Sequence, residues 1–540
     1  MRYVIKTQKE NETIYDTGKM CGRRNLCMSE TKWRIYAVFV GLALWFCCSL
    51  QLSPVADASS VQDTTVLTQD TMLDPDTIAP KLSASYSVMN QKAVVKVKAK
   101  DAQSGLAKLV WIKGDIQKAN SSKWASAKDI LADKQFTVTK KGTYSILAQD
   151  AMGNTSIFNL EVIMEMKAVW VSFLEYSPEG YTEKSFKRYV NTILDTCVTK
   201  HLNTVIFHVR PFADAMYDSS YFPWSKYASG KAGKNPGFDP LKYAVDAAHK
   251  RGLSIQAWIN PYRITGQGTS TKSLPKGSIA RKWKTSKSSS VRRRVLAYEG
   301  KLYFNPASTA VQKLIVNGVK EIVEKYDIDG VHFDDYFYPN LGSRYKKNFD
   351  AKEYKAYVKK CAKQKKKAMT IVKWRRKNID NLVKKTYAAV KKADKNCVFG
   401  ISPAGNIDNL YAKNNYYCDV KKWMNSDKYI DYICPQIYWS FTQKTCPYKK
   451  TLKRWLDIPR SNSVNMYVGL AAYRAGISKK EAVSITDKEW AKKSDILKRQ
   501  VTTARDTGKV DGFVLFSYQN LTSKSAKKEM KNLMKVINKR

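Results

Sequence analysis

Two adjacent carboxylates follow an apolar run in residues 329–338, DGVHFDDYFY. Cleavage of a glycosidic bond requires two carboxyl groups: one protonates the leaving oxygen, and the other attacks or stabilises the anomeric carbon or activates water. Because side chains alternate along a strand, Asp334 shares a face with His332, and Asp335 points to the opposite side. We predict that Asp334 is the nucleophile or base. The alternative interpretation is that both acids only terminate the strand.

The proton donor is less clearly marked in the sequence. Three acidic residues at or near predicted strand ends stay open for this role: Glu175, Asp214 and Asp335. Asp335 has the competing role of holding a loop or a neighbouring arginine.

Aromatic, amide and basic side chains gather at the same strand ends. Aromatic faces stack on the apolar faces of pyranose rings, while amides and guanidinium groups hydrogen-bond sugar hydroxyls. A random mix of strand terminators would not show this convergence of residue types. The predicted substrate-binding residues are His208, Arg210, Trp258, Asn260, Tyr262, Arg263, His332, Tyr336, Gln436, Tyr438, Trp439 and Tyr518.

Structural roles stay open for several of these residues. His208 is compatible with a hydrogen-bonded core histidine, Trp258 with barrel packing, and Arg210 with an ion pair to Asp334. A metal site built from His208, His332 and Asp334 would fit two-histidine, one-carboxylate chemistry. The chain contains no His-x-x-x-His spacing, so we predict no metal and no cofactor.

The elements that position these residues form a repeating pattern from Lys167 onward. Strand-like apolar runs alternate with amphipathic stretches in which apolar residues recur every three or four positions. Nearly continuous apolar runs are expected of parallel strands that are covered on both faces. We predict an α/β fold, a (β/α)8 TIM barrel over residues 166–540, with the active site at the C-terminal ends of its strands. The predicted strands span residues 168–174, 204–210, 253–260, 329–335, 397–402, 432–438, 466–472 and 512–518.

Residues 79–165 show a different pattern. Short runs alternate between apolar and polar residues with a period of two, which is typical of a small antiparallel β-sandwich. The stretch GTYSILAQDAMGNTS resembles the closing hairpin of bacterial immunoglobulin-like modules, and we predict an all-β immunoglobulin-like spacer. Residues 59–78 are rich in Ser, Thr and Asp and are predicted to be a flexible linker.

The N-terminal residues 1–58 contain a predicted export signal. Residues 32–58 give a basic start, an apolar stretch of about 18 residues and a small-residue ending at Ala56 and Ala58, which is the layout of a secretory signal peptide. The apolar stretch is also long enough to stay as an uncleaved membrane anchor. We predict a secreted or cell-surface protein that meets a membrane only through this segment.

The charge balance is strongly basic. The chain carries 94 Lys and Arg against 47 Asp and Glu, a formal net charge of +47. Such an excess favours a polyanionic partner. The basic residues lie on predicted helical faces and no nucleic-acid-binding signature is present, so we predict anionic cell-wall polymers as partners and no nucleic acid.

Several motifs of the barrel region, in this order, resemble the bacterial glycosyl hydrolase-like 10 family. They are FHVRPFADAMYDSSYFPWS, AWINPYRI, YFNP, DGVHFDDYFYP, ISPAGN, PQIYW and DGFVLFSY, within residues 165–520. The resemblance implies an extracytoplasmic barrel that acts on cell-envelope polysaccharide, and related members are linked to peptidoglycan glycan strands. DGVHFDD also resembles the fourth-strand motif of the alpha-amylase superfamily, in which the aspartate matching Asp334 is the nucleophile. His332 stands where that motif has an arginine.

The sequence therefore predicts an exported glycoside hydrolase that acts on cell-envelope polysaccharide. The alternative is a non-catalytic polysaccharide-binding barrel that keeps the stacking residues without the acid. The fifth predicted strand carries no Glu where an amylase-like barrel has its acid, which leaves this alternative open.

Overall fold

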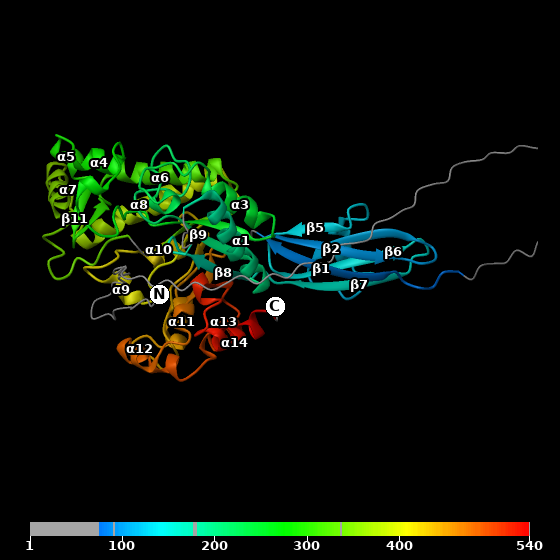
Figure 1. Cartoon of the computed structure of the whole chain (residues 1–540). Helices are drawn as coiled ribbons and strands as arrows, with labels where there is room; N and C mark the ends of the chain where they lie inside the picture. The colour runs from blue at the N-terminus through cyan, green and yellow to red at the C-terminus, as the bar shows by residue number, and fades with distance from the viewer. Residues whose placement is uncertain (1–74, 90–91, 176–180, 335–336, 539–540) are drawn as a thin grey trace, which may run out of the picture.

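The computed structural model describes residues 75–89, 92–175, 181–334 and 337–538. An extended β module and a larger α/β barrel make up this part of the chain (Figure 1). The predicted signal or anchor and most of the predicted linker lie outside the described residues. No helix among the described residues is long and apolar enough to cross a membrane.

The β module consists of two antiparallel sheets that share one apolar core. One sheet has the strand order β1-β2-β5 and the other β4-β3-β6-β7. Trp111 stacks on Phe136 of the opposite sheet, with ring centroids 4.2 Å apart. The predicted closing hairpin is confirmed, since β6 pairs with β7 as far as Gln149 and Thr155. The strands are β1 (Lys81–Met89), β2 (Lys92–Lys100), β3 (Leu106–Lys113), β4 (Lys128–Asp129), β5 (Gln135–Val138), β6 (Gly142–Asp150) and β7 (Thr155–Val162).

Eight parallel strands close into a barrel and confirm the predicted (β/α)8 fold. Each strand pairs with the next along the chain, and β17 pairs with β8 to close the ring. The strands are β8 (Met166–Val171), β9 (Thr204–Arg210), β10 (Ser254–Ile259), β13 (Gly330–Phe333), β14 (Val398–Ile401), β15 (Tyr432–Ile433), β16 (Asn465–Leu470) and β17 (Gly512–Phe516).

The sixth barrel strand is shorter than the predicted range 432–438. Regular pairing ends at Ile433, because Pro435 has no N–H group to donate to a neighbouring strand. Gln436 pairs again only through isolated bridges to Ala404 and Gly469. This irregular stretch turns the Gln436 side chain toward the end of β13.

Helices follow the strands and cover the outside of the barrel (Figure 1). Helix starts are marked by caps, as in α3, where Asp239 accepts hydrogen bonds from the N–H groups of Leu241 and Lys242 and Pro240 occupies the first turn. The helices that follow the successive strands are α1 (Glu183–Thr199), α3 (Pro240–His249), α6 (Thr309–Lys325), α8 (Ile371–Ala393), α10 (Val420–Met424), α11 (Tyr448–Leu456), α13 (Ile496–Asp506) and α14 (Lys527–Ile537).

The barrel has two cores, one inside the ring of strands and one between strands and helices. The inner core is built of large side chains such as Trp170, Tyr432 and Tyr467. A Cβ atom at Gly400 would lie 2.1 Å from the ring of Tyr432, so only glycine leaves room for that ring on the neighbouring strand. The inner core is therefore a packed layer that supports the mouth above it.

The β module sits against the N-terminal ends of the barrel strands. Val88 and Met164 line a hollow together with Ser254 and Tyr467, which belong to the first residues of β10 and to β16. Lys141 Nζ also lies 2.8 Å from a carboxylate oxygen of Asp511, just before β17. The mouth formed by the C-terminal strand ends thus faces away from the module.

Candidate active site

Asp334 follows β13 directly, at the mouth of the barrel. The residue is 8% exposed, and Gln436 Nε2 donates a hydrogen bond to its Oδ1 at 2.9 Å. The same nitrogen donates to the carbonyl oxygen of Ser402 at 3.1 Å, so segments after β14 and β15 position the carboxylate. Asp335 and Tyr336, predicted as proton-donor candidate and substrate-binding residue, lie outside the described residues.

Glu175 lies in the loop after β8 and is 5% exposed. The N–H of Ser172 donates to its Oε2 at 2.6 Å, while Ser517 Oγ and the N–H of Gln519 both donate to Oε1 at 2.8 Å. Burial raises the pKa of this carboxyl to about 7, although the three donors favour the ionised form. Glu175 therefore ties the loop after β8 to the loop after β17 and titrates near neutral pH.

Asp214 lies in the loop after β9 and is half-buried. Burial raises the pKa of its carboxyl to about 6, while a hydrogen bond from Ser225 and the charges of Lys226 and Arg210 act in the opposite direction. Its Oδ1 has no hydrogen-bond partner among the described residues. A carboxyl oxygen that lacks a donor favours the protonated form, which is the form that a general acid requires.

His208, Trp258 and Asn260 form one packed unit just below the mouth. The His208 and Trp258 rings stack with centroids 3.6 Å apart, and Trp258 Nε1 donates to Asn260 Oδ1 at 3.2 Å. All three residues are 5% exposed or less. Burial lowers the pKa of His208 well below its usual value, so the ring is neutral. The structure brings these predicted residues together, as a wall beneath the mouth.

His332 lies inside the barrel with no exposed surface. Trp170 Nε1 lies 3.1 Å from His332 Nε2, and because an indole only donates, Nε2 accepts and the ring proton is on Nδ1. Nδ1 donates to Tyr432 OH at 2.7 Å, and that hydroxyl donates to Gln256 Oε1 at 2.5 Å. Burial lowers the pKa of the ring to about 3. The prediction that His332 binds substrate is wrong, since both nitrogens hold the barrel interior together.

These contacts also bear on metal binding. A two-histidine, one-carboxylate site at the mouth would need a ring nitrogen of His332, and both are engaged. Among the described residues, one group of three such side chains could hold an ion: Asp76, Asp101 and Asp150, whose oxygens lie within 4.8 Å of one another. They belong to the β module, far in sequence from the mouth.

Arg210 points out of the barrel, contrary to the prediction. Its guanidinium lies over the ring of Phe222 at 4.3 Å, and a Cβ atom at Gly318 of α6 would lie 2.9 Å from Arg210 Nη1. The cause is a shift of register between β9 and β10: Trp258 pairs with His208, but the next residue of β10 pairs with Arg210. The extra residue breaks the strand alternation, so Arg210 neither reaches substrate nor pairs with Asp334.

Two predicted tyrosines also lie in the outer core. Tyr262 has no exposed surface and packs between strands and helices. Tyr518 is 5% exposed and packs edge-on against Tyr189 of α1, with centroids 6.5 Å apart. This packing favours structural roles for both rings, and their contact with substrate stays a prediction.

Partly exposed rings stand around the mouth instead. Phe516, the last residue of β17, lies 6.1 Å from Tyr438, 5.9 Å from Tyr473 and 6.0 Å from Trp170 between ring centroids. Phe173, after β8, lies edge-on to His208 at 5.3 Å. Phe516 and Phe173 are not among the predicted residues. Strand alternation in GFVLFSY, which puts residues 512, 514 and 516 on one face, could have identified Phe516 as a residue at the mouth.

The other predicted residues remain at the rim. Arg263 is half-buried and lies over the ring of Phe212 at 5.2 Å. Trp439 is half-buried, and a Cβ atom at Gly405 would lie 2.9 Å from its ring, so glycine leaves space for it. Contact of Arg263, Trp439 and Tyr438 with substrate stays a prediction.

Known proteins are similar to this chain over the barrel. The sequence profile of the glycosyl hydrolase-like 10 family matches residues 165–492. Glycosyl hydrolase YngK of Bacillus subtilis (strain 168) is 34% identical over 391 residues, which are 67% of this chain and 70% of that protein. Glycosyl hydrolase DigH of Escherichia coli (strain K12) is 32% identical over 342 residues, 58% of this chain and 72% of that protein. Among solved structures, the glycoside hydrolase domain of PgaB (BpsB) from Bordetella bronchiseptica aligns with 68% of this chain and 99% of its own, with 11% identity and a TM-score of 0.43.

The matched profile begins where the β module ends, so the immunoglobulin-like assignment of that module stays a prediction. The profile nevertheless covers more than half of the chain, and the Bacillus relative is similar over two thirds of both proteins. This chain belongs to the glycosyl hydrolase-like 10 family and is a glycoside hydrolase.

Proposed function

We propose that this protein is an exported glycosidase that cleaves cell-envelope polysaccharide, with peptidoglycan glycan strands as its substrate. The observation that carries the proposal is the Asp334 carboxylate, which directly follows β13 and accepts a hydrogen bond from Gln436 at 2.9 Å. The partly exposed rings of Tyr438, Tyr473 and Phe516 gather at the same end of the barrel, after β15, after β16 and at the end of β17. A fixed carboxylate can attack the anomeric carbon or activate water, and the rings can stack on pyranose faces.

Asp214 is the proton donor in this proposal. Its pKa, raised to about 6 by burial, and its oxygen without a donor favour the protonated carboxyl. Glu175 has a higher pKa, about 7, but all its hydrogen bonds come from donors that support the ionised form and tie two loops together. Glu175 and Asp335 remain alternative proton donors, and the activities of the variants at these positions distinguish them from Asp214.

Digestion of purified glycan strands tests the activity. Strands with and without stem peptides are incubated with the enzyme, and the products are analysed by mass spectrometry. We expect shorter saccharides with new reducing ends, and the comparison of the two kinds of strand shows whether stem peptides affect cleavage. Tight binding without any new reducing end would favour the non-catalytic polysaccharide-binding barrel.

Export is the part of the proposal that rests on residues 32–58. Fractionation of cells that express the full chain or a chain without residues 1–58 tests it. The full chain is expected outside the cytoplasm and the truncated chain inside. Equal distribution of the two chains would contradict export through this segment.

Anionic wall polymers are the proposed partners of the basic surface, because the net charge is +47. Exposed ion contacts are screened by salt, with a Debye length of about 3 Å at 1 M. Retention on isolated cell walls is expected at low salt and lost at 1 M salt. Retention that does not change with salt would contradict an electrostatic attachment.

A further inference from the structure

The segment that joins β10 to β13 is unusually basic. It contains no acidic residue from Arg251 to Tyr298, and residues 281–294, RKWKTSKSSSVRRR, carry seven basic side chains. These residues form the end of α4 (Ile279–Lys284), α5 (Ser289–Arg292) and the turn that leads to β11 (Val295–Tyr298). The basic residues therefore come together in space.

They line a cavity of about 420 Å³. Four of its lining residues are cationic and none is acidic. The lining residues are Lys284, Ser289, Arg292, Arg293, Val295, Leu296, Ala297 and Lys352, the last of which comes from α7 (Ala351–Lys363). We call this hollow the basic cavity.

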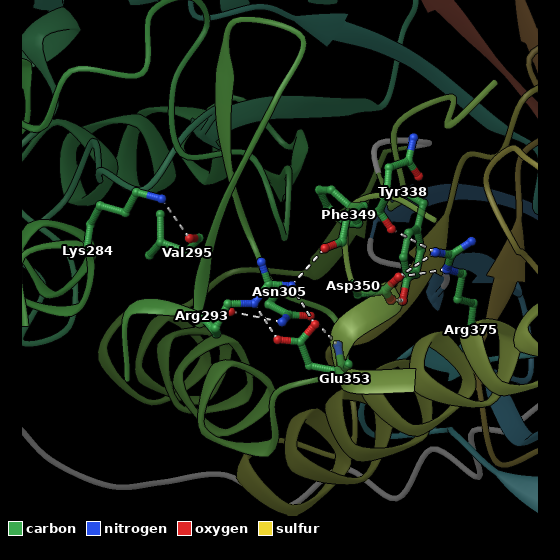
Figure 2. Close-up of polar contacts among 11 residues, drawn as sticks. Lys284, Arg293, Val295, Asn305, Tyr338, Phe349, Asp350, Glu353 and Arg375 are labelled. Carbon is green, nitrogen blue, oxygen red and sulfur yellow. Dashed lines mark hydrogen bonds and ion pairs between the residues drawn. The ribbon is translucent and has the colours of Figure 1, made fainter. Parts of the chain in front are cut away.

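One of the four cations is neutralised. Arg293 Nε and Nη2 each lie 2.6 Å from an oxygen of Glu353, as Figure 2 shows. Among the described residues, Lys284 Nζ donates to the carbonyl oxygen of Val295, at 3.2 Å, and to no other group. Lys284, Arg292 and Lys352 form no ion pair within the part of the chain that the structure describes. About three positive charges thus remain around the cavity.

A neighbouring cation shows the usual arrangement. Arg375 is fully buried and lies 2.6 Å from Asp350, which also accepts a hydrogen bond from Tyr338 at 2.8 Å (Figure 2). Cations withdrawn from water are ordinarily paired in this way. Lys284 is half-buried and has no acidic partner in the described part of the chain, and both burial and the charge of Arg293 lower its pKa. An anion in the cavity would supply the missing partner.

The basic cavity lies on the side of the barrel mouth. Arg293 Nη2 donates to the carbonyl oxygen of Phe349 at 2.8 Å, and the next residue, Asp350, holds Tyr338. Tyr338 is four residues after Asp334. One segment, from Asp334 to Glu353, therefore links the predicted nucleophile to the cavity wall.

We propose that the basic cavity binds phosphate groups of an anionic cell-envelope glycopolymer. The inference rests on the proposed function, because such a polymer would be the substrate or be joined to it. Guanidinium groups bind phosphate oxygens in a bidentate geometry, and a Lys adds a compact point charge. Several unpaired cations around one hollow fit repeated phosphate groups better than a single carboxylate.

The test measures binding without cleavage. Poly(glycerol phosphate), polygalacturonate and a single-stranded DNA oligonucleotide are titrated calorimetrically into the full chain at physiological salt. The variant Lys284→Gln/Lys352→Gln removes two cavity charges. Lys479→Gln/Lys480→Gln removes two exposed charges on α12 (Lys479–Ser484) and is the matched control. Lys352→Glu, at an exposed position, repeats the test with minimal risk to folding, which melting curves check.

We expect the phosphate polymer to bind best, and the cavity variant to lose about tenfold in affinity, or 1.4 kcal/mol, while the control stays within about twofold. Equal losses in the cavity and control variants would overturn the proposal, since binding would then be spread over the surface. DNA or polygalacturonate binding as tightly as poly(glycerol phosphate) would also overturn it. Because no cleavage is measured, a failure to bind leaves the glycosidase proposal intact, and a failure to cleave leaves this one intact.

Discussion

His332 and Asp334 lie two residues apart at the end of β13, yet their surroundings differ in kind. His332 has no exposed surface, and both of its nitrogens are bound by barrel residues. Asp334 is 8% exposed and is held through Gln436 at the rim. His332 belongs to a closed hydrogen-bond network that fixes the barrel interior, whereas Asp334 lies at the rim, where a ligand can bind.

The polar groups below the mouth form a chain from Trp170 through His332 and Tyr432 to Gln256. Such a chain is stable only when each member has its partner, because an unsatisfied polar group is costly in a low dielectric. The carboxyls on the mouth side of the barrel, Glu175 and Asp214, have raised pKa values instead. Shifted titration next to a fixed framework is a pattern that clusters at functional sites.

The largest effect is expected for Asp334→Asn. The amide keeps the shape and the hydrogen bonding at the rim but removes the negative charge that stabilises an oxocarbenium-like transition state, so turnover should fall by about 10³-fold or more. Release of reducing ends from glycan strands measures it. Turnover at the wild-type rate would mean that Asp334 only terminates the strand and has no catalytic role. If only Asp335→Asn is inactive, Asp335 is the catalytic carboxylate, and the prediction from strand alternation is wrong by one residue.

Asp214→Asn and Glu175→Gln separate the candidate proton donors. Loss of a general acid costs about 10²- to 10⁴-fold in rate. We expect this loss for Asp214→Asn, with the alkaline decline of activity that begins near the raised pKa of about 6 disappearing in the variant. A full pH profile of kcat for both variants is the measurement. If Glu175→Gln loses more rate than Asp214→Asn, without a drop in melting temperature, Glu175 and not Asp214 is the proton donor.

Glu175→Gln also tests the raised pKa of this buried carboxyl. Its folded pKa is about 7 against an ordinary value of 4.5, so the folded state holds the proton more tightly. Its contribution to stability is therefore full below pH 4.5 and is lost as the pH rises through 7, by about 3 kcal/mol. The free energy of unfolding of the wild type, relative to the variant, should fall over that interval. Glu324→Gln on the exposed side of α6 is the control, and an identical trend in both variants would contradict the assignment.

His332→Leu is expected to lower the free energy of unfolding by about 1–3 kcal/mol, because the Trp170 N–H loses its buried acceptor. Activity per folded molecule should change much less than in Asp334→Asn. Chemical denaturation checks the first statement and turnover below the melting transition the second. A stable but inactive His332→Leu protein would place the ring in the chemistry after all.

The smallest effect is expected at the rim. Phe516→Ala removes a ring that is available for stacking, and a lost ring contact of about 1 kcal/mol raises KM by about fivefold, with kcat little changed. Tyr189→Phe, in the outer layer, is the control. A fall in kcat at constant KM would mean that Phe516 acts on the transition state instead.

The sequence predicted the barrel well because strand and helix patterns are local. The apolar runs gave all eight strands, apart from the sixth, which Pro435 shortens. The errors at the site came from long-range pairing. The register shift that turns Arg210 outward depends on β10, and the partners of His332 come from β8 and β15. Neither is encoded within the segment that carries the residue.

Asp334 and Gln436 show the opposite case. Both were selected because they end strands, and closure of the barrel brings them to 2.9 Å across 102 residues. Phe516 was not predicted as a site residue, because it lies inside an apolar run. The neighbouring residues in the sequence do not distinguish a ring at the mouth from a ring in the core. Residue type and position at a strand end were thus informative, whereas apolar character alone was not.

The most direct test places Asp334→Asn and His332→Leu side by side. For each variant, glycan affinity, turnover and the free energy of unfolding are measured on the same preparation. We expect an Asp334→Asn protein that folds and binds like the wild type but does not cleave, and a His332→Leu protein that is less stable but cleaves when folded. The reverse pattern, cleavage by Asp334→Asn and a folded, inactive His332→Leu protein, would contradict the division between the mouth and the interior.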